Sequence, residues 1–366
     1  MTLRCRSFAA REWLSGRPLA STLLLGTPAV EVRSAGEGRG LGLFATRGIK
    51  PFTQILSDAP LILMKPTDDL PELYQQFTNL PKDDRDKYLA LSYHADPNRD
   101  AMLKNKLLQR GFGKEALQEM ADVAGIMQTN AFNVDLNDGR GSRHRALFPN
   151  VARINHSCAP NAHVCFYAPS ESRPQGRMVV HSLRHLQPGE EILISYFSIL
   201  LPRSERKTRT QKWGFTCICP VCTGEEDAEK LRKDIQAFSN EQMRLANRAR
   251  ATMKDIKSSI ETGEALLEQT SAIPELCPAL PDLLEGLGML EAKALLIQKR
   301  EARRGNILAF LEQSAIWEAR ITGVESAATI RRLSKAAQFA GREDGERSAQ
   351  ILADESGRLE VQWTTT

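Results

Sequence analysis

Three cysteines lie within six residues of one another, in the pattern Cys217-x-Cys219-x-x-Cys222. Three thiolates on one short segment can bind a tetrahedral zinc ion, and a structural zinc site needs a fourth ligand from elsewhere in the chain. Cys158 and Cys165 are the candidates for that ligand. The alternative is a set of reduced thiols or an adventitious disulfide. The chain has seven cysteines, an odd number, and their clustering suits metal binding in a reducing compartment better than a disulfide framework.

A second polar cluster reads Asn-His-Ser-Cys-Ala-Pro-Asn at 155–161. His156 and Cys158 could form a nucleophilic pair, but residues two apart point in different directions, and no third group is identified that would orient them. Taken singly, such a histidine is more often structural, and such a cysteine more often a small buried apolar side chain. This segment alone does not identify a reaction.

Residues 38–42 read Gly-Arg-Gly-Leu-Gly, a sequence that allows the main chain to approach a ligand closely. The segment lacks the spacing of a dinucleotide-binding loop and the Gly-Lys-Ser/Thr of a phosphate-binding loop, so a glycine-rich β-turn is the alternative.

Glu190 and Glu191 form a carboxylate pair that could act as an acid/base couple. Their place after Pro188 and Gly189 favours roles in a turn and in packing.

The elements that must position these residues follow from the apolar pattern. Short apolar runs broken by glycine and proline predict strands in 30–64 and again in 131–197. Between them, apolar residues recur at three- and four-residue spacing after Gly113, which predicts a helical insert over 66–130. Residues 225–366 are predicted to be helical throughout. A domain boundary is therefore expected near 225.

Composition and charge narrow the class of protein. The chain has 366 residues, of which 42% are hydrophobic and 26% charged, and it has no apolar run long enough to span a membrane. Residues 1–224 carry 29 basic and 21 acidic side chains, whereas 225–366 carry 20 and 24, which indicates two differently charged modules. The basic excess is too weak to indicate direct nucleic-acid binding.

Taken in order, these segments resemble a SET-domain protein lysine methyltransferase. The resemblance rests on Gly-Leu-Gly-Leu-Phe-Ala-Thr at 40–46, the helical insert, Arg-Ile-Asn-His-Ser-Cys-Ala-Pro-Asn at 153–161, Gly-Glu-Glu-Ile-Leu-Ile-Ser-Tyr at 189–196, and the cysteine cluster. It covers about 30–224. Asn-Ala-Phe at 130–132 and the helical C-terminal half resemble the SET and MYND (SMYD) branch or its fungal relatives.

Two features depart from that branch. MYND is a double zinc finger rich in cysteine and histidine, whereas residues 66–130 contain no cysteine and only His94. The chain therefore has no MYND finger, and the partner binding of that finger is not expected. The second departure is Trp213, at a position where relatives often have a tyrosine that lines the lysine channel. The number of methyl groups transferred is therefore left open.

The resemblance implies an α+β fold: a SET fold of small sheets, in which the Asn-His segment is threaded under a neighbouring loop as a pseudoknot, followed by an all-α, TPR-like C-terminal domain. The expected domains, in chain order, are a flexible N-terminal extension at 1–29, the SET domain at 30–200 with its insert at 66–130, a zinc-binding post-SET loop at 201–224, and the helical domain at 225–366.

The resemblance also implies the site residues. S-adenosylmethionine would be bound by residues of the glycine-rich turn, of the Asn-His segment and of the post-SET region, namely Arg39, Gly40, Leu41, Gly42, Asn155, His156, Tyr196 and Phe215. Tyr196 would be the catalytic phenol, and Phe132 and Trp213 would line the substrate channel. The family's zinc site corresponds to four cysteines: Cys158, Cys217, Cys219 and Cys222.

The expected activity is methyl transfer from S-adenosylmethionine to the side-chain amine of a protein lysine, histone or non-histone. The alternative is a SET scaffold that has lost catalysis and serves as a protein-interaction module; a zinc-dependent nucleic-acid binder is a third hypothesis.

We expect a monomer that binds no membrane and acts in the nucleus, the cytoplasm or both. Arg4, Arg6, Arg11 and Arg17 also fit a mitochondrial leader. In relatives the C-terminal helices face the lysine channel, which predicts an acidic wall that favours basic peptides.

Overall fold

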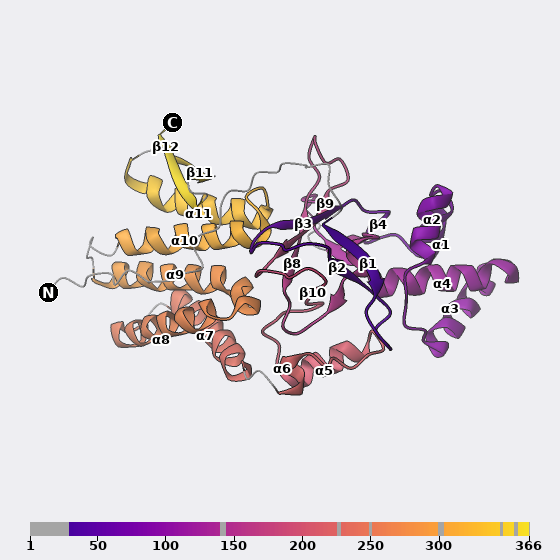
Figure 1. The fold of residues 1–366 in the computed structure, drawn as a ribbon. Helices are drawn as coiled ribbons and strands as arrows, with labels where there is room; N and C mark the ends of the chain where they lie inside the picture. The colour runs from indigo at the N-terminus through magenta and orange to yellow at the C-terminus, as the bar shows by residue number, and fades with distance from the viewer. Residues whose placement is uncertain are drawn as a thin grey trace.

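The computed structural model describes residues 29–139, 144–224, 228–248, 251–298, 304–344, 347–354 and 358–365. Three small β-sheets form the centre of the molecule, with helices on both sides (Figure 1). The N-terminal extension expected at 1–29 lies outside the described residues, except for residue 29. No described helix combines the length and the apolar character that a membrane span requires.

The central sheets contain the ten strands that precede the post-SET region. The first sheet has the order β1-β2-β10-β7, the second β3-β9-β8 and the third β4-β6-β5. Their bounds are β1 Val30–Ser34, β2 Leu41–Ala45, β3 Gln54–Asp58, β4 Ile62–Met64, β5 Phe132–Val134, β6 His144–Leu147, β7 Asn155–His156, β8 Ala162–Tyr167, β9 Arg177–Ser182 and β10 Glu191–Ile194. Buried residues such as Leu43, Phe148 and Ile192 form their common core, which confirms the predicted small-sheet fold.

The two-residue strand β7 attaches the Asn-His segment to the first sheet. It runs parallel to β10, with Asn155 opposite Leu193 and His156 opposite Ile194. Five residues further on, Asn161 accepts a hydrogen bond from the Leu193 N–H at 2.8 Å and donates its own N–H to the Leu193 carbonyl at 3.1 Å. The segment is therefore held along β10, as the predicted threading requires.

The insert between the two strand regions is helical, as predicted. It consists of α1 Leu70–Thr78, α2 Lys82–Leu89, α3 Pro97–Gln109 and α4 Lys114–Asn130. Asp96 caps α3, because its carboxylate accepts the N–H groups of Asn98 and Arg99 at 3.1 Å each. The buried Tyr88 of α2 donates its hydroxyl to the Val123 carbonyl of α4 at 2.7 Å. The insert thus has its own packed interior.

The post-SET region differs in part from the predicted loop at 201–224. It begins with helix α5 Arg203–Gln211, which follows Pro202, and it ends with the four-residue helix α6 Pro220–Thr223. Gly224 then adopts a φ of 90°, the left-handed conformation that commonly ends a helix. Between these two helices lies the segment at 212–219, which has no helix or strand and carries the first two clustered cysteines.

The C-terminal part is helical only as far as Asp344. Its helices are α7 Glu229–Asn247, α8 Met253–Ser271, α9 Leu280–Gln298, α10 Arg304–Thr322 and α11 Ala327–Asp344. The expectation of helix to residue 366 is wrong for the hairpin of β11 Arg347–Ala353 and β12 Leu359–Thr365. Leu359 and Val361 alternate with polar residues, the period of a strand with one buried face, and they pack on Ile316 of α10.

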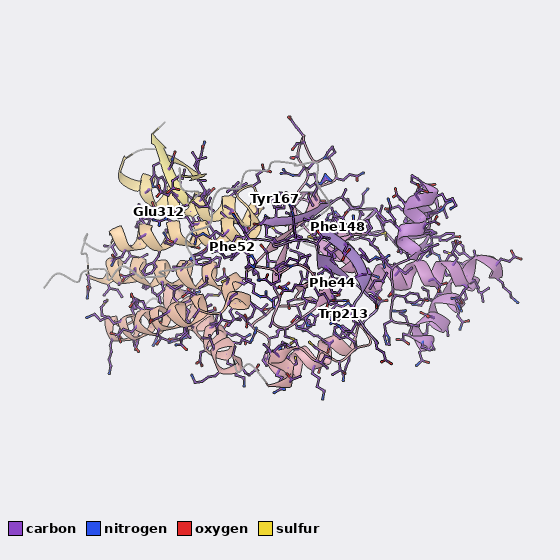
Figure 2. The ribbon with its side chains drawn as sticks, viewed as in Figure 1. Phe44, Phe52, Phe148, Tyr167, Trp213 and Glu312 are labelled. Carbon is purple, nitrogen blue, oxygen red and sulfur yellow. The ribbon has the colours of Figure 1, made fainter. Side chains whose placement is uncertain are left out.

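The C-terminal helices pack against the second sheet, as Figure 1 shows for α10 and the strands beside it. Leu183, Cys277 and Ile321 are buried in one cluster that spans both parts. Tyr167 of β8 donates its hydroxyl to the Thr322 carbonyl of α10 at 2.8 Å, and Figure 2 shows this tyrosine where helices and sheet meet. The predicted helical layer against the SET region is confirmed.

Candidate functional site

A cavity of about 1080 Å³ opens beside the first sheet. Residues of the glycine-rich turn, the Asn-His segment, the insert and the post-SET segment line it together. Among the residues assigned from the sequence, the lining includes Arg39, Gly40, Leu41, Asn155, His156, Tyr196, Trp213, Phe215, Cys217 and Cys219. Trp213 lies between the β region and helix α5 (Figure 2). The structure therefore brings most of the predicted site together around one cavity.

The glycine-rich turn connects β1 to β2 at the edge of this cavity. Gly38 and Gly40 adopt φ values of +72° and +66°, a left-handed conformation that side chains disfavour. Apart from the two adjacent residues in the chain, no heavy atom lies within 4 Å of the position where a Cβ atom would stand on either glycine. The main chain of this turn is therefore open to a ligand.

Gly42 is constrained for a different reason. A Cβ atom on Gly42 would lie 2.6 Å from Oε1 of Glu191 and 3.1 Å from Nδ2 of Asn155. These two side chains are hydrogen-bonded at 2.8 Å, and Asn155 also donates to the Leu41 carbonyl at 3.2 Å. Gly42 thus leaves room for a polar contact between β7 and β10, directly behind the cavity.

Glu191 is a site residue that the sequence analysis assigned to turn and packing roles. Besides accepting from Asn155, its carboxylate pairs with Arg39 at 2.6 Å, and its side chain is only 11% exposed. It therefore joins the glycine-rich turn to the Asn-His segment. Strand periodicity could have indicated it, because Glu191 and Leu193 lie on the same face of β10 and Leu193 lines the cavity.

Glu190, in contrast, has the structural role expected from the sequence. Its carboxylate pairs with Arg184 at 2.6 Å and accepts the Gln187 N–H at 2.9 Å. Burial opposes the charge of Glu190, but these partners outweigh it and lower its pKa. The two consecutive glutamates thus point to different neighbours, and they do not form an acid/base couple.

His156 is held between the sheet and the cysteines. Its Nδ1 accepts the Tyr196 N–H at 3.1 Å, and its Nε2 lies 3.4 Å from Sγ of Cys158. Burial lowers the pKa of His156 to about 4, so the ring is neutral at pH 7. Because Nδ1 is an acceptor, we assign the ring proton to Nε2, where it points toward the sulfur. His156 thereby orients Cys158 as well as the backbone of Tyr196.

Tyr196 lines the cavity. Its hydroxyl donates to the Ile154 carbonyl at 2.8 Å, and its ring centroid is 5.4 Å from that of Trp213 and 6.4 Å from that of Phe215. Burial, with a smaller contribution from the Glu191 charge, raises the pKa of Tyr196 above its ordinary value. The phenol is therefore neutral at pH 7 and can orient a reactant, but it cannot act as a base.

The aromatic wall of the cavity is fixed to the insert. Trp213 donates its indole N–H to the Thr129 carbonyl at the end of α4, at 3.1 Å. Gly214 has a φ of +78°, and any side chain there would overlap the ring of His94. His94 itself lines the cavity, so the insert supplies wall residues that the sequence analysis did not assign to the site.

Phe132 does not line the cavity. It lies on β5 in the third sheet, and its ring packs edge-on against Phe148 with centroids 6.0 Å apart. Thr129 and Asn130, at the end of α4, line the cavity instead. The chain leaves the cavity between Asn130 and Phe132, because the strand turns the phenylalanine toward the core that the sheets share.

The four cysteines assigned to zinc form one cluster. The sulfur atoms of Cys158, Cys217, Cys219 and Cys222 all lie within 4.8 Å of one another. Sγ of Cys158 is 4.0 Å from Sγ of Cys217 and 3.5 Å from Sγ of Cys222. Tetrahedral zinc with bonds of about 2.3 Å places its sulfurs about 3.8 Å apart, so the donor set and its spacing fit this metal.

The alternative fourth ligand, Cys165, is excluded from this cluster. It lies on β8, where its thiol contacts the Phe166 carbonyl at 3.8 Å. Burial raises the pKa of Cys165 to about 12, which keeps it a thiol at neutral pH. Cys277 is likewise buried in the cluster at the C-terminal helices. Among the cysteines that the structure describes, only the predicted four converge.

The SET domain family model matches residues 40–197. The histone-lysine N-methyltransferase set5 of Schizosaccharomyces pombe is 26% identical over 216 residues, which are 59% of this chain and 56% of that protein. The N-lysine methyltransferase SMYD2 of Gallus gallus is 39% identical over 90 residues, which are 24% of this chain and 19% of that protein.

The chain thus spans about half of set5 and a fifth of SMYD2. Among solved structures, the SET domain of LSMT bound to lysine and AdoHcy aligns with 87% of this chain and 88% of that chain, at 13% identity and a TM-score of 0.37. The family assignment therefore rests on the sequence matches.

Proposed function

Because residues 40–197 form a SET domain related to those of set5 and SMYD2, we propose that this chain transfers a methyl group from S-adenosylmethionine to the side-chain amine of a protein lysine. The observation that carries the proposal is the convergence of the glycine-rich turn, the Asn-His segment, Tyr196 and the aromatic wall on one cavity. The names of the relatives support lysine as the acceptor.

The cavity suits S-adenosylmethionine in its volume and in its chemistry. A volume of about 1080 Å³ is at the upper end of small-molecule sites and leaves room for a second reactant. The open main chain at Gly38 and Gly40 would follow the cofactor, Asn155 would hold it from the sheet side, and Phe215 would cover its adenine. When bound, S-adenosylmethionine supplies a methyl group on a positively charged sulfur, from which the methyl passes to a neutral amine.

The protein's own task is to present a neutral, aligned amine. A lysine in water has a pKa of about 10.4 and is protonated at pH 7. The aromatic wall of Tyr196, Trp213 and Phe215 removes water from the amine, and desolvation favours its neutral form. Tyr196 donates its proton to Ile154, so its oxygen offers lone pairs toward the reacting groups. Alignment and exclusion of water thus supply the catalysis.

The zinc that the cysteine cluster fits would have a structural role. Four thiolates leave no open position for a substrate, which is typical of structural zinc sites. The metal would join the segment that carries Phe215 and Cys217 to the Asn-His segment that carries Cys158. Zinc would therefore hold two walls of the cavity at a fixed separation.

The substrate we propose is a protein, histone or non-histone, that presents a lysine to this cavity. Set5 and SMYD3 of Homo sapiens carry names that specify histone lysine, whereas SMYD2 is named for lysine alone. Together, these names support the side chain of a protein lysine, histone or non-histone, as the methyl acceptor. The cavity is lined by aromatic rings around Tyr196. Such a lining can contact the apolar alkyl chain of a lysine while its amine reaches the reacting groups.

Methyl transfer can be tested with the full-length protein. Labelled S-adenosylmethionine is incubated with the enzyme and with core histones or fractionated cell proteins, and the modified residue is identified by mass spectrometry. The proposal expects label on lysine, and none with the Tyr196→Phe variant. Tight cofactor binding without transfer to any protein would instead identify a SET scaffold without catalysis.

A further inference from the structure

Two arginines are fully buried beside the cysteine cluster. Arg206 of α5 is 1% exposed and Arg232 of α7 is 0% exposed. Burying a guanidinium is unfavourable unless opposite charge and hydrogen bonds compensate for the lost water. Negative charge near these two guanidinium groups is therefore needed to stabilise them.

Arg206 has one carboxylate partner. Its Nη1 and Nη2 both lie 3.0 Å from Oε2 of Glu229, and Nη1 also donates to the Leu201 carbonyl at 2.6 Å. Its Nε is buried and has no hydrogen-bond partner. Burial opposes its charge, but Cys158 and then Glu229 outweigh this and raise the pKa of Arg206. The cysteine cluster is thus close enough to act on Arg206.

Arg232 has no carboxylate within salt-bridge distance among the described residues, although the charge of Glu275 acts on it from farther away. Its Nη2 donates to the Cys158 carbonyl at 3.1 Å, and its Nη1 donates to the Ile199 carbonyl. Within the described part of the chain, no salt bridge joins Arg232 to a carboxylate, and its buried Nε has no hydrogen-bond partner. Burial, followed by the charge of Arg206, lowers the pKa of Arg232. Arg232 is therefore a buried cation whose hydrogen bonds all go to neutral carbonyl groups.

The cysteines change the charge around these two arginines when they bind a metal. Glu229 pairs with Arg206, and Glu275 acts on Arg232 without forming a salt bridge to it. A zinc ion with four thiolates carries two negative charges, because each thiolate contributes one and the ion offsets two. Metal-bound thiolates would therefore place negative charge directly beside both buried guanidinium groups, whereas neutral thiols would not.

We propose that Arg206 and Arg232 are the counter-charges of a four-thiolate zinc centre, and that Arg232 makes helix α7 a part of that centre. This inference rests on the zinc site of the proposed function, and it does not depend on methyl transfer. It assigns a positioning role to a residue of the C-terminal helices. Through Arg232, these helices support the metal and, with it, the wall of the cavity that the cysteines carry.

The affinity for zinc tests this proposal without any assay of activity. Full-length Arg232→Gln is titrated with zinc against a chromophoric chelator, alongside the wild type. Loss of groups that support metal ligands typically weakens metal binding about 10- to 100-fold, and we expect a zinc Kd raised by this factor. A Kd within about twofold of wild type would overturn the proposal.

Two control variants separate this effect from a general loss of charge or stability. Lys230→Gln removes an exposed cation from the same helix. Arg332→Gln removes a mostly buried arginine that pairs with Asp282, Glu285 and Glu318 of the same helical domain. Both controls should keep the wild-type zinc Kd. A rise in Kd for Arg332→Gln equal to that for Arg232→Gln would show that any destabilised helical domain loses zinc, and it would overturn the proposal.

Glu229→Gln should change the zinc Kd in the opposite direction. This variant tests the proposal even if Arg232→Gln does not fold. The amide keeps the shape of the side chain, but it no longer competes with the thiolates for Arg206. We therefore expect zinc binding at least about threefold tighter, from the loss of a nearby like charge. Unchanged or weaker binding would overturn the proposal. Absence of zinc from the wild-type protein would overturn the zinc centre itself.

Discussion

Glu191 of β10 accepts a hydrogen bond from Asn155 of β7 at 2.8 Å, and Gly42 of β2 leaves the space in which they meet. The same carboxylate pairs with Arg39 at 2.6 Å. Three strands and the glycine-rich turn are therefore joined at one mostly buried carboxylate. The orientation of Asn155, which we propose faces the cofactor, depends on this contact.

Gly42→Ala should weaken cofactor binding. The added Cβ would lie 2.6 Å from Oε1 of Glu191, which must then move and release Asn155. The Glu191 carboxylate ends a flexible side chain, so the cost is mainly its lost hydrogen bond to Asn155, about 1 kcal/mol, and we expect the Kd for S-adenosylmethionine to rise about fivefold, measured by isothermal titration calorimetry. Gly48→Ala is the control, since its Cβ would meet nothing closer than 3.7 Å. Equal affinities for both variants would contradict this account of Gly42.

Tyr196→Phe should abolish catalysis while leaving the cofactor bound. The hydroxyl donates to Ile154 and would align the reactants, and misalignment typically costs about 100-fold in rate. We expect kcat to fall by at least about this factor and the cofactor Kd to stay within a few-fold of wild type. Single-turnover methyl transfer measures the first quantity and calorimetry the second. Wild-type activity in Tyr196→Phe would show that the Tyr196 hydroxyl is not catalytic.

The purified protein should contain one zinc per chain. Cys222→Ser removes one of the four clustered sulfurs and should lower the zinc content and, through the wall of the cavity, the affinity for the cofactor. Cys277→Ser is the control, because Cys277 lies in an apolar cluster away from these sulfurs. Elemental analysis by mass spectrometry measures the metal. Full zinc occupancy in Cys222→Ser would refute the assignment.

Glu275→Gln should alter the choice of substrate. Glu275 is the one residue beyond 225 that lines the cavity in the described part of the chain, so the acidic wall expected from the helical half is reduced to this side chain. We expect KM for a peptide rich in lysine and arginine to rise about two- to threefold at low salt, with kcat unchanged. Glu268→Gln, on the exposed side of α8, is the control. No difference between the two variants would mean that Glu275 does not steer peptides.

Stability should fall as the pH drops from 6.5 toward 4. Burial, followed by the charge of its cross-strand neighbour His163, lowers the pKa of His181 to about 4. The unfolded chain takes up this proton near pH 6.5 and the folded protein only near 4, so the stability present above pH 6.5 is lost on acidification. At pH 5, His181 alone should account for about 2 kcal/mol of that loss.

Urea denaturation of wild type and His181→Gln at pH 7.5 and pH 5 measures this contribution. The variant should lose less stability on acidification than the wild type, by about 2 kcal/mol. His185→Gln, at an exposed histidine of the neighbouring turn, should behave as the wild type does. An identical pH dependence for wild type and His181→Gln would exclude His181 as the cause.

Much of this architecture is readable from local patterns. Apolar spacing predicted the strands and the helical insert, because the side chains of strands and helices repeat over a few residues. The same is true of three zinc ligands, since Cys217, Cys219 and Cys222 lie on one short segment. The hairpin after Asp344 was not predicted, because the helical periodicity of the preceding region was taken to continue to residue 366. The alternation of Leu359 and Val361 with polar residues is the local signal of its second strand.

Only the tertiary structure decided which distant residues meet. Cys158 and Cys165 were equal candidates by spacing, and the turn before β8 brings the first to the cluster and carries the second away. Strand periodicity places Glu191 on the cavity side of β10, but it does not identify the partners of Glu191 or Arg232, which lie 36 and 74 residues away. Such contacts depend on strand register and helix docking, which are set by the packing of the whole core, and no local spacing encodes them.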